Sequence, residues 1–203
     1  VEDPIEFYHQ PVGETVFSMR EIGVHASDYD SAVENALRSK PNIIFIGEML
    51  ANTTRKAALH AATTGHLCIT TAHAGSVEEA IDGFIGSFTA DEQPQIKARL
   101  SESLLGVMCQ TLVPTKNGKL TAAREIMTAN VDTKGMIAKG DLVQLHAQLE
   151  GKPQLNTSLE LDLLRLVKEG KIWPKDAVAY SKDNKHMVDL LNRYGINPEE
   201  SKN

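Results

Sequence analysis

The sequence has few cysteines and lacks the runs that mark membrane or nucleic-acid partners. Its 203 residues include two cysteines, Cys68 and Cys109, both in apolar contexts and neither in a C-x-x-C spacing. This pattern is typical of reduced core thiols in a cytosolic protein, so neither a zinc site nor a disulfide framework is expected. Acidic residues number 27 and basic residues 21, without a block of like charges, so nucleic-acid binding is not expected as the main function. No apolar run approaches the roughly 20 residues of a membrane span.

The most informative feature of the sequence is a short apolar run. Asn42–Ile46 is rich in β-branched residues, follows Pro41 and precedes Gly47. Such a run is typical of a strand that is buried on both faces of a parallel sheet. Glu48 is therefore expected just beyond the carboxyl end of this strand.

A helix and a second strand are expected next. The segment after Glu48 has a helical pattern, with Asn52 placed as its N-cap and Gly65 as its C-terminal stop. Leu67–Thr71 then predicts a strand that ends two residues before His73. The result is a βαβ unit with an acid and an imidazole at the carboxyl edge of the sheet, where open α/β sheets hold their ligands.

Glu48 and His73 each allow two interpretations. An apolar strand that ends in Gly-Glu is typical of the Walker B segment of nucleotide hydrolases, whose carboxylate holds a magnesium shell or orients the attacking water. Taken alone, Glu48 fits better with a solvated glutamate after a core strand. Taken alone, His73 fits better with a histidine that caps a loop or is satisfied in the core.

The N-terminal segment gathers carboxylates. Glu2, Asp3 and Glu6 surround Pro4, which keeps the local backbone out of a helix. Such a cluster suits metal or water handling, and it equally suits a solvated acidic turn. The chain opens at Val1 as though cut within a domain, so we expect a fragment.

The remaining pattern predicts an α/β fold. We expect an extended segment at Thr15–Ile22, a helix opened by Asp28, a helix started by a Ser76/Glu79 capping box, a hairpin turning at Asn117-Gly118, and mostly helix from Lys134 onward. The hairpin would add an antiparallel edge to the first sheet. With 41% apolar residues the chain can bury one good core and a smaller one, and we expect domains at 1–130 and 131–203.

Four short motifs follow one another along the chain. They are Glu2-Asp3-Pro4-Ile5-Glu6, Arg20-Glu21-Ile22-Gly23, Ile43–Met49, and Gly65-His66 through His73. In this order they resemble the Asp box, its arginine segment, the Walker B segment and the His box of the secretion ATPases of the type II and type IV pilus class. Within that class the chain most resembles the PilT-like retraction ATPases.

The resemblance implies a fold, a cofactor set and residue roles. The expected fold is a partial RecA-like ATPase sheet with an edge hairpin and a C-terminal helical subdomain, and the expected cofactors are ATP and magnesium. Glu48, Glu2 and His73 would be catalytic, and Glu48 and Glu2 would also contact the metal. The resemblance further assigns cofactor binding to three residues, Arg20, Arg38 and His66.

The resemblance also implies partners and a location. Its members work as hexameric rings on an inner-membrane pilus or secretion platform, without nucleic acid. The expected location is therefore the bacterial cytoplasm, peripheral to the inner membrane.

Departures from the family pattern limit what the chain can do. Leu50-Ala51 replaces the usual Arg-Asp after Gly-Glu-Met, and no G-x-x-x-x-G-K-[ST] loop occurs anywhere. That loop cradles the phosphates, so we expect the isolated chain to be inactive and to correspond to the C-terminal half of a longer protein. Two alternatives stay open, namely a DotB-like ATPase of type IVB secretion or conjugation, and a truncated, non-enzymatic module of such a ring.

Overall fold

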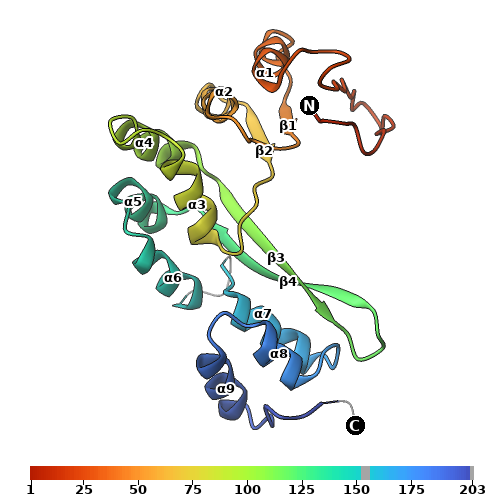
Figure 1. Cartoon of the computed structure of the whole chain (residues 1–203), viewed down its shortest axis with the longest axis vertical. Coiled ribbons are helices and arrows are strands. Elements are labelled where there is room, and N and C mark those ends of the chain that lie inside the picture. Colours follow the sequence, from red (N-terminus) through yellow and green to blue (C-terminus); the bar gives the residue numbers. More distant parts are fainter. Residues whose placement is uncertain (152–155, 202–203) are drawn as a thin grey trace. The chain divides into compact units, whose positions relative to one another are not determined.

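A computed structural model describes residues 1–151 and 156–201, which form two compact units (Figure 1). The N-terminal unit comprises Val1–His73 and Phe84–Leu104, and the C-terminal unit comprises Ala74–Gly83 and the described residues from Leu105 onward. In chain order the elements are α1 (Tyr29–Arg38), β1 (Ile43–Ile46), α2 (Asn52–Thr63), β2 (Leu67–Thr70), α3 (Val77–Gly86), α4 (Gln93–Ser103), β3 (Gly106–Pro114), β4 (Leu120–Thr128), α5 (Val131–Lys139), α6 (Leu142–Gly151), α7 (Leu159–Lys168), α8 (Pro174–Tyr180) and α9 (Asn184–Arg193). The expected α/β class is confirmed.

The N-terminal unit contains the predicted βαβ arrangement. Strands β1 and β2 pair in parallel, with Ile43 opposite Leu67 and Ile46 opposite Thr70, and α2 connects them (Figure 1). Gly65 follows the helix with a φ of 96°, a conformation that glycine adopts without steric cost. The predicted C-terminal stop of α2 is therefore confirmed.

The predicted N-cap of α2 is wrong by one residue. Ala51 occupies the cap position without a side-chain hydrogen bond, and Asn52 is the first helical residue. The Asn52 side chain instead donates to the carbonyl oxygen of Ser87 and accepts from the Arg55 guanidinium at 3.0 Å. The amide group thus ties α2 to the segment after α3, a contact that local capping preference does not anticipate.

The sheet of the N-terminal unit is covered on one face only, so the prediction of burial on both faces is wrong. Ile44 and Ile46 are buried, and they pack with Val33 of α1 and with Ala58 and Ala61 of α2. Both helices therefore cover the same face. The opposite face keeps exposures of 40–55% at the four residues Ile43, Phe45, Leu67 and Ile69. We call these four residues the bare sheet face.

The C-terminal unit is built on the predicted hairpin. Strands β3 and β4 pair antiparallel from Gly106 opposite Thr128 to Pro114 opposite Leu120. Gly118 turns the chain with a φ of 80°. Among the described residues the hairpin forms a two-stranded sheet of its own and is not paired with β1 or β2, so its expected place as an added edge of the first sheet is not what the structure has.

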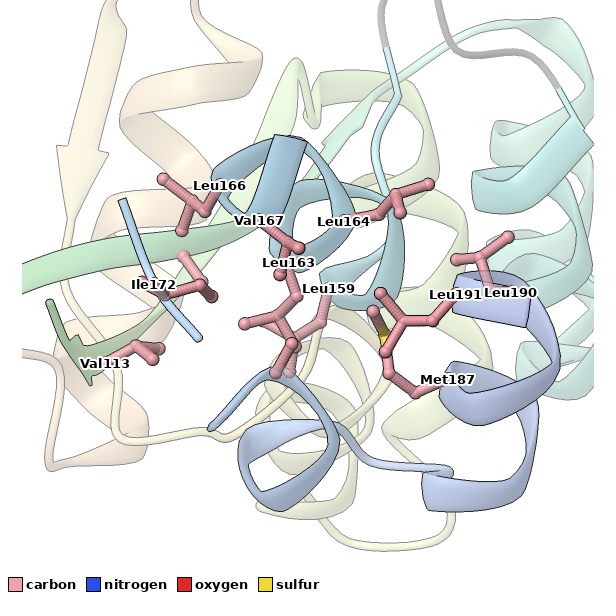
Figure 2. Packing of buried hydrophobic residues seen from close by; sticks show 12 residues of the cluster. Val113, Leu159, Leu163, Leu164, Leu166, Val167, Ile172, Met187, Leu190 and Leu191 are labelled. Carbon is pink, nitrogen blue, oxygen red and sulfur yellow. The ribbon is translucent and has the colours of Figure 1, made fainter. Parts of the chain in front are cut away.

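Helices α7 and α8 pack against this hairpin, and α9 packs against α7 and α8. Figure 2 shows the shared core, to which Val113 of β3, Leu163 of α7 and Leu191 of α9 all belong. The boundary expected at residue 130 describes functional parts and stays a prediction. The compact units divide the chain differently because the hairpin and the later helices share one core. Within the described residues, no helix is both long and apolar enough to cross a membrane.

A pair of isoleucines in β1 tests the one-sided burial. Ile46 is 0% exposed and Ile43 is 55% exposed in the same strand. Ile46→Ala should lower the free energy of unfolding by about 2–5 kcal/mol, because it leaves a cavity. Ile43→Ala, the matched control, should cost no more than about 1 kcal/mol. Chemical denaturation of both variants measures the difference, and equal losses would contradict the one-sided packing.

Candidate functional site

Glu48 and His73 meet at the carboxyl ends of β1 and β2. Each residue follows its strand by two or three positions, and the parallel pairing brings both strand ends to the same edge. The Nε2 atom of His73 lies 3.8 Å from Oε2 of Glu48. The His73 side chain is 91% exposed and that of Glu48 is 36% exposed, so both can reach a ligand in solvent. The structure thus confirms that these two predicted residues are neighbours.

Val1 and Glu2 pack against Gly47, the residue that precedes Glu48. The Gly47 amide donates to the carbonyl oxygen of Val1 at 2.8 Å, and the Glu2 amide donates to that of Arg20 at 3.0 Å. A Cβ atom at position 47 would lie 3.3 Å from the Val1 oxygen and 3.5 Å from both Cα and Cγ of Glu2. The contacts with Glu2 would be ordinary van der Waals contacts, but the Val1 oxygen would have to shift by a few tenths of an ångström, so glycine suits this position.

A threonine fixes the two strand ends to each other. The hydroxyl of Thr71 donates to the carbonyl oxygen of Gly47, across the space between the ends of β2 and β1. Gly47 immediately precedes Glu48, and Thr71 lies two residues before His73. The bond therefore helps to hold the spacing between the imidazole and the carboxylate.

Tyr29 is a neighbour of the site that sequence reasoning missed. It is the first residue of α1 and packs against the core of the N-terminal unit. Burial raises the pKa of its phenol, and the nearby carboxylates of Glu48, Asp3 and Glu2 raise it further. Acidic groups therefore gather at this edge. The sequence holds no signal for this, because an aromatic residue at the start of an amphipathic helix is typical of ordinary packing.

The residues expected to bind the cofactor are not all at this edge. The Arg20 guanidinium donates to the carbonyl oxygen of Ala32 at 3.2 Å, so its side chain lies on α1 while its backbone pairs with Glu2. His66 precedes β2, with Nδ1 3.4 Å from the Thr64 hydroxyl, whereas His73 follows that strand. The two histidines are separated by the four residues of β2, which rise roughly 3.3 Å each, and by Thr71 and Ala72.

Arg38 also lies away from the acidic edge. It is an exposed residue in the last turn of α1, nine residues after Tyr29. The helix rises about 1.5 Å per residue, which places Arg38 at the far end from the acidic edge. Ligand contacts by Arg38 or His66 stay predictions, and they would lie at the other end of these elements.

The site offers carboxylate oxygens to a metal but no closed cage. Across residues 1–151 and 156–201, no three His, Cys, Asp or Glu side chains are arranged to hold a metal ion. Magnesium is usually held by one or two carboxylates together with substrate phosphates and water, and oxygen donors suit it. Glu2 and Glu48 therefore fit magnesium if a bound phosphate supplies further oxygens.

Two glycines test the close packing at this site. Gly47→Ala should speed hydrogen exchange of the amide at position 47, because the added Cβ crowds the Val1 carbonyl oxygen that accepts from this amide. Gly83→Ala is the matched control, since nothing lies within 4 Å of a Cβ at this helical position. It should stabilise the protein by roughly 0.5–1 kcal/mol. Unchanged exchange at position 47 in the first variant would show that the contact with Val1 is not tight.

Comparison with known proteins places the chain among secretion and pilus proteins. The family model described as "Type II/IV secretion system protein" matches residues 1–158. The type IV pilus ATPase PilU of Pseudomonas aeruginosa is 32% identical over 197 residues, which cover 96% of this chain and 51% of PilU. The crystal structure of the pilus retraction motor PilT with bound ADP superposes with a TM-score of 0.83 at 31% identity, covering 91% of this chain and 52% of that one.

A second solved structure is also similar. The ATPase DotB of Legionella pneumophila matches with a TM-score of 0.70 at 28% identity, covering 77% of this chain and 43% of DotB. The chain thus spans about half the length of the relatives it matches. The family model, however, covers well over half of the chain and includes Glu2, Glu48 and His73. The chain belongs to the type II/IV secretion system protein family.

Proposed function

We propose that this chain is the C-terminal ATPase part of a secretion-type motor that couples ATP hydrolysis to type IV pilus retraction. The observation that carries the proposal is the meeting of Glu48 and His73, 3.8 Å apart, at the carboxyl ends of two parallel strands. This edge is where open α/β sheets bind their ligands. Membership in a family that includes pilus ATPases gives the reaction class.

In the proposed mechanism Glu48 orients the attacking water. A carboxylate that is one-third exposed can accept a hydrogen bond from water while it stays fixed to the end of β1. Glu2, held against Gly47, would position water beside it. His73 is almost fully exposed and would donate from its imidazole to the oxygens of a terminal phosphate. Magnesium, when bound with the nucleotide, would neutralise phosphate charge, with Glu2 and Glu48 as its protein neighbours.

The phosphate cradle must come from outside the sequence described here. No G-x-x-x-x-G-K-[ST] segment is present, and phosphoryl transfer depends mainly on positioning and charge stabilisation. We therefore propose that hydrolysis requires a P-loop segment joined to this chain. The bare sheet face and the relatives' greater length both support a larger protein as the working unit.

Retraction is preferred over the alternatives for a specific reason. The similarity to the retraction motor PilT extends over 91% of the chain with a TM-score of 0.83, against 77% and 0.70 for one DotB structure and 82% and 0.75 for another. A DotB-like role in secretion or conjugation is the second candidate. A third is a non-enzymatic module that joins a ring of longer proteins. Neighbouring genes for pilus or transfer proteins, and an upstream P-loop in the reading frame, would separate the three.

The working assembly belongs to the same proposal. We infer a homo-oligomer, hexameric when the protein is longer, that works in the cytoplasm at the inner membrane against a pilus or secretion platform protein. The names of two relatives, a pilus ATPase and a pilus retraction motor, support the pilus partner, and the ring is what the resemblance to this class of ATPases implies. Native mass spectrometry of the longer protein measures the oligomeric state directly.

Glu48→Gln tests the assigned catalytic residue in a protein that contains the P-loop segment. The change keeps the shape but removes the charge that orients water, so turnover should fall by a factor on the order of 10² to 10⁴. Nucleotide binding should persist, as measured by calorimetry. Glu34→Gln, an exposed position on α1, is the matched control and should leave the rate unchanged. Parent-like turnover of Glu48→Gln would rule out the Walker B role.

The isolated 203-residue chain should neither bind nor hydrolyse ATP. The chain has Glu2, Glu48 and His73 but not the P-loop, whose backbone amides and lysine hold the phosphates. Without that positive charge, the two carboxylates repel a triphosphate. Calorimetry should show no saturable binding in the micromolar range, and phosphate release should equal the buffer background. Joining the P-loop segment should restore both activities. Magnesium-dependent turnover by the isolated chain that Glu48→Gln abolishes would overturn this expectation.

A further inference from the structure

A buried glutamate of the hairpin makes polar contacts to two distant parts of the C-terminal unit. Glu125 of β4 is 1% exposed. Its Oε1 accepts a hydrogen bond from the amide of Val77, the first residue of α3, at 2.7 Å. Its Oε2 pairs with the ammonium group of Lys182, which lies between α8 and α9. One carboxylate therefore joins the start of α3 to the α8–α9 connection.

Lys182 is anchored before it reaches Glu125. Its backbone amide donates to Oε1 of Glu160 at 3.0 Å, and Glu160 is itself buried in α7. The side chain of Lys182 is 30% exposed, and its Nζ also lies 4.0 Å from Oε2 of Glu78 in the first turn of α3. The backbone anchor fixes where the ammonium can go, so less conformational entropy is lost when the pair forms.

The surroundings of this pair are acidic. The pKa of the Cys109 thiol is raised to about 11, mainly by burial and also by Glu125, Glu78 and Glu79, whereas Lys182 acts to lower it. Lys182 is thus the cation that offsets several acids in this region. A buried carboxylate that loses its cation must take up a proton or regain water, and either change weakens its grip on the Val77 amide.

The start of α3 is held by further bonds of the same kind. The Glu79 amide donates to the Ser76 hydroxyl at 3.0 Å, which is one half of the predicted capping box, but Oε2 of Glu79 accepts from the Gly75 amide at 2.8 Å, where a capping box has the Ser76 amide. These bonds fix residues 75–79 as one turn. The only residue between this turn and His73 is Ala74.

We propose that Lys182 is a positioning residue that acts through Glu125. The pair holds the first turn of α3, and chain continuity through Ala74 thereby restricts the backbone of His73. The helical C-terminal part would in this way influence a residue of the nucleotide site. The significance of His73 rests on the proposed function, but the restriction itself is a property of this chain.

Hydrogen exchange and NMR of the 203-residue chain test the proposal without any nucleotide. In Lys182→Met the amides of Val77 and Glu79 should exchange faster, on the order of tenfold, because the loss of one charge-assisted contact loosens the turn. The imidazole resonance of His73, assigned by its loss in His73→Gln, should shift. Lys182→Arg keeps the charge and should restore both signals.

The matched control is Lys171→Met, which removes a surface pair with Glu169. It should leave the exchange at Val77 and the His73 resonance at their parent values. A Lys182→Met protein with parent-like exchange at Val77, or with a His73 resonance that does not move, overturns the proposal. So does faster exchange spread evenly over β3, β4 and α7, because that result indicates loss of stability without positioning.

A second variant serves if Lys182→Met does not fold. Glu125→Gln replaces one of the two carboxylate oxygens by an NH2 group, so in the same orientation the side chain can accept from Val77 or from Lys182 but not from both. Faster exchange at Val77 together with a shifted His73 resonance supports the proposal, and parent values for both overturn it. Since no measurement involves ATP, a failure here is distinct from a failure of the proposed ATPase function.

Discussion

The parallel pairing of β1 with β2 is the interaction on which the candidate site depends. Parallel strands place both carboxyl ends at one edge, so residues 25 positions apart in the sequence, Glu48 and His73, become neighbours. The amide of Gly47 and the hydroxyl of Thr71 extend this order beyond the last strand residues. Without the pairing, the imidazole and the carboxylate would be two unrelated surface groups.

The two-stranded sheet of the N-terminal unit has one covered face and one exposed face. Two short strands covered by α1 and α2 on one face leave the bare sheet face apolar and exposed. Leucine, isoleucine and phenylalanine at such density are typical of a surface that is covered in the working protein. Under the proposed function, a further segment that carries a phosphate cradle would complete the site.

The C-terminal unit is held by a different kind of contact. Its apolar core joins the hairpin to α7, α8 and α9, while buried polar side chains set their register. Asp162 accepts from the Arg124 amide and Asn156 from the Thr128 amide, both at 2.8 Å, so these side chains satisfy the outer edge of β4. An edge strand protected in this way resists pairing with other chains. Glu125 and Lys182 add the contact that reaches α3.

The local sequence pattern alone predicted most of the helices and strands, and it predicted that Glu48 and His73 follow two neighbouring strands. The strands around Glu48 and His73, the stop at Gly65 and the hairpin turn at Gly118 follow from short-range rules, because periodicity and glycine conformations act over a few residues. The motif order also indicated the family, which the comparison with known proteins confirmed.

Tertiary structure alone decided the rest, because it depends on what packs against each face. Ile43 and Phe45 are exposed because no helix covers their face of the sheet. The Asn52 side chain does not cap α2 but donates to the carbonyl oxygen of Ser87. His66 lies at the opposite end of β2 from His73. The tertiary structure also brought Tyr29 to the acidic edge and Lys182 to Glu125, 57 residues away in the sequence. Contacts over such separations leave no local pattern, since the sequence sets each residue's chemistry and the fold chooses its partner.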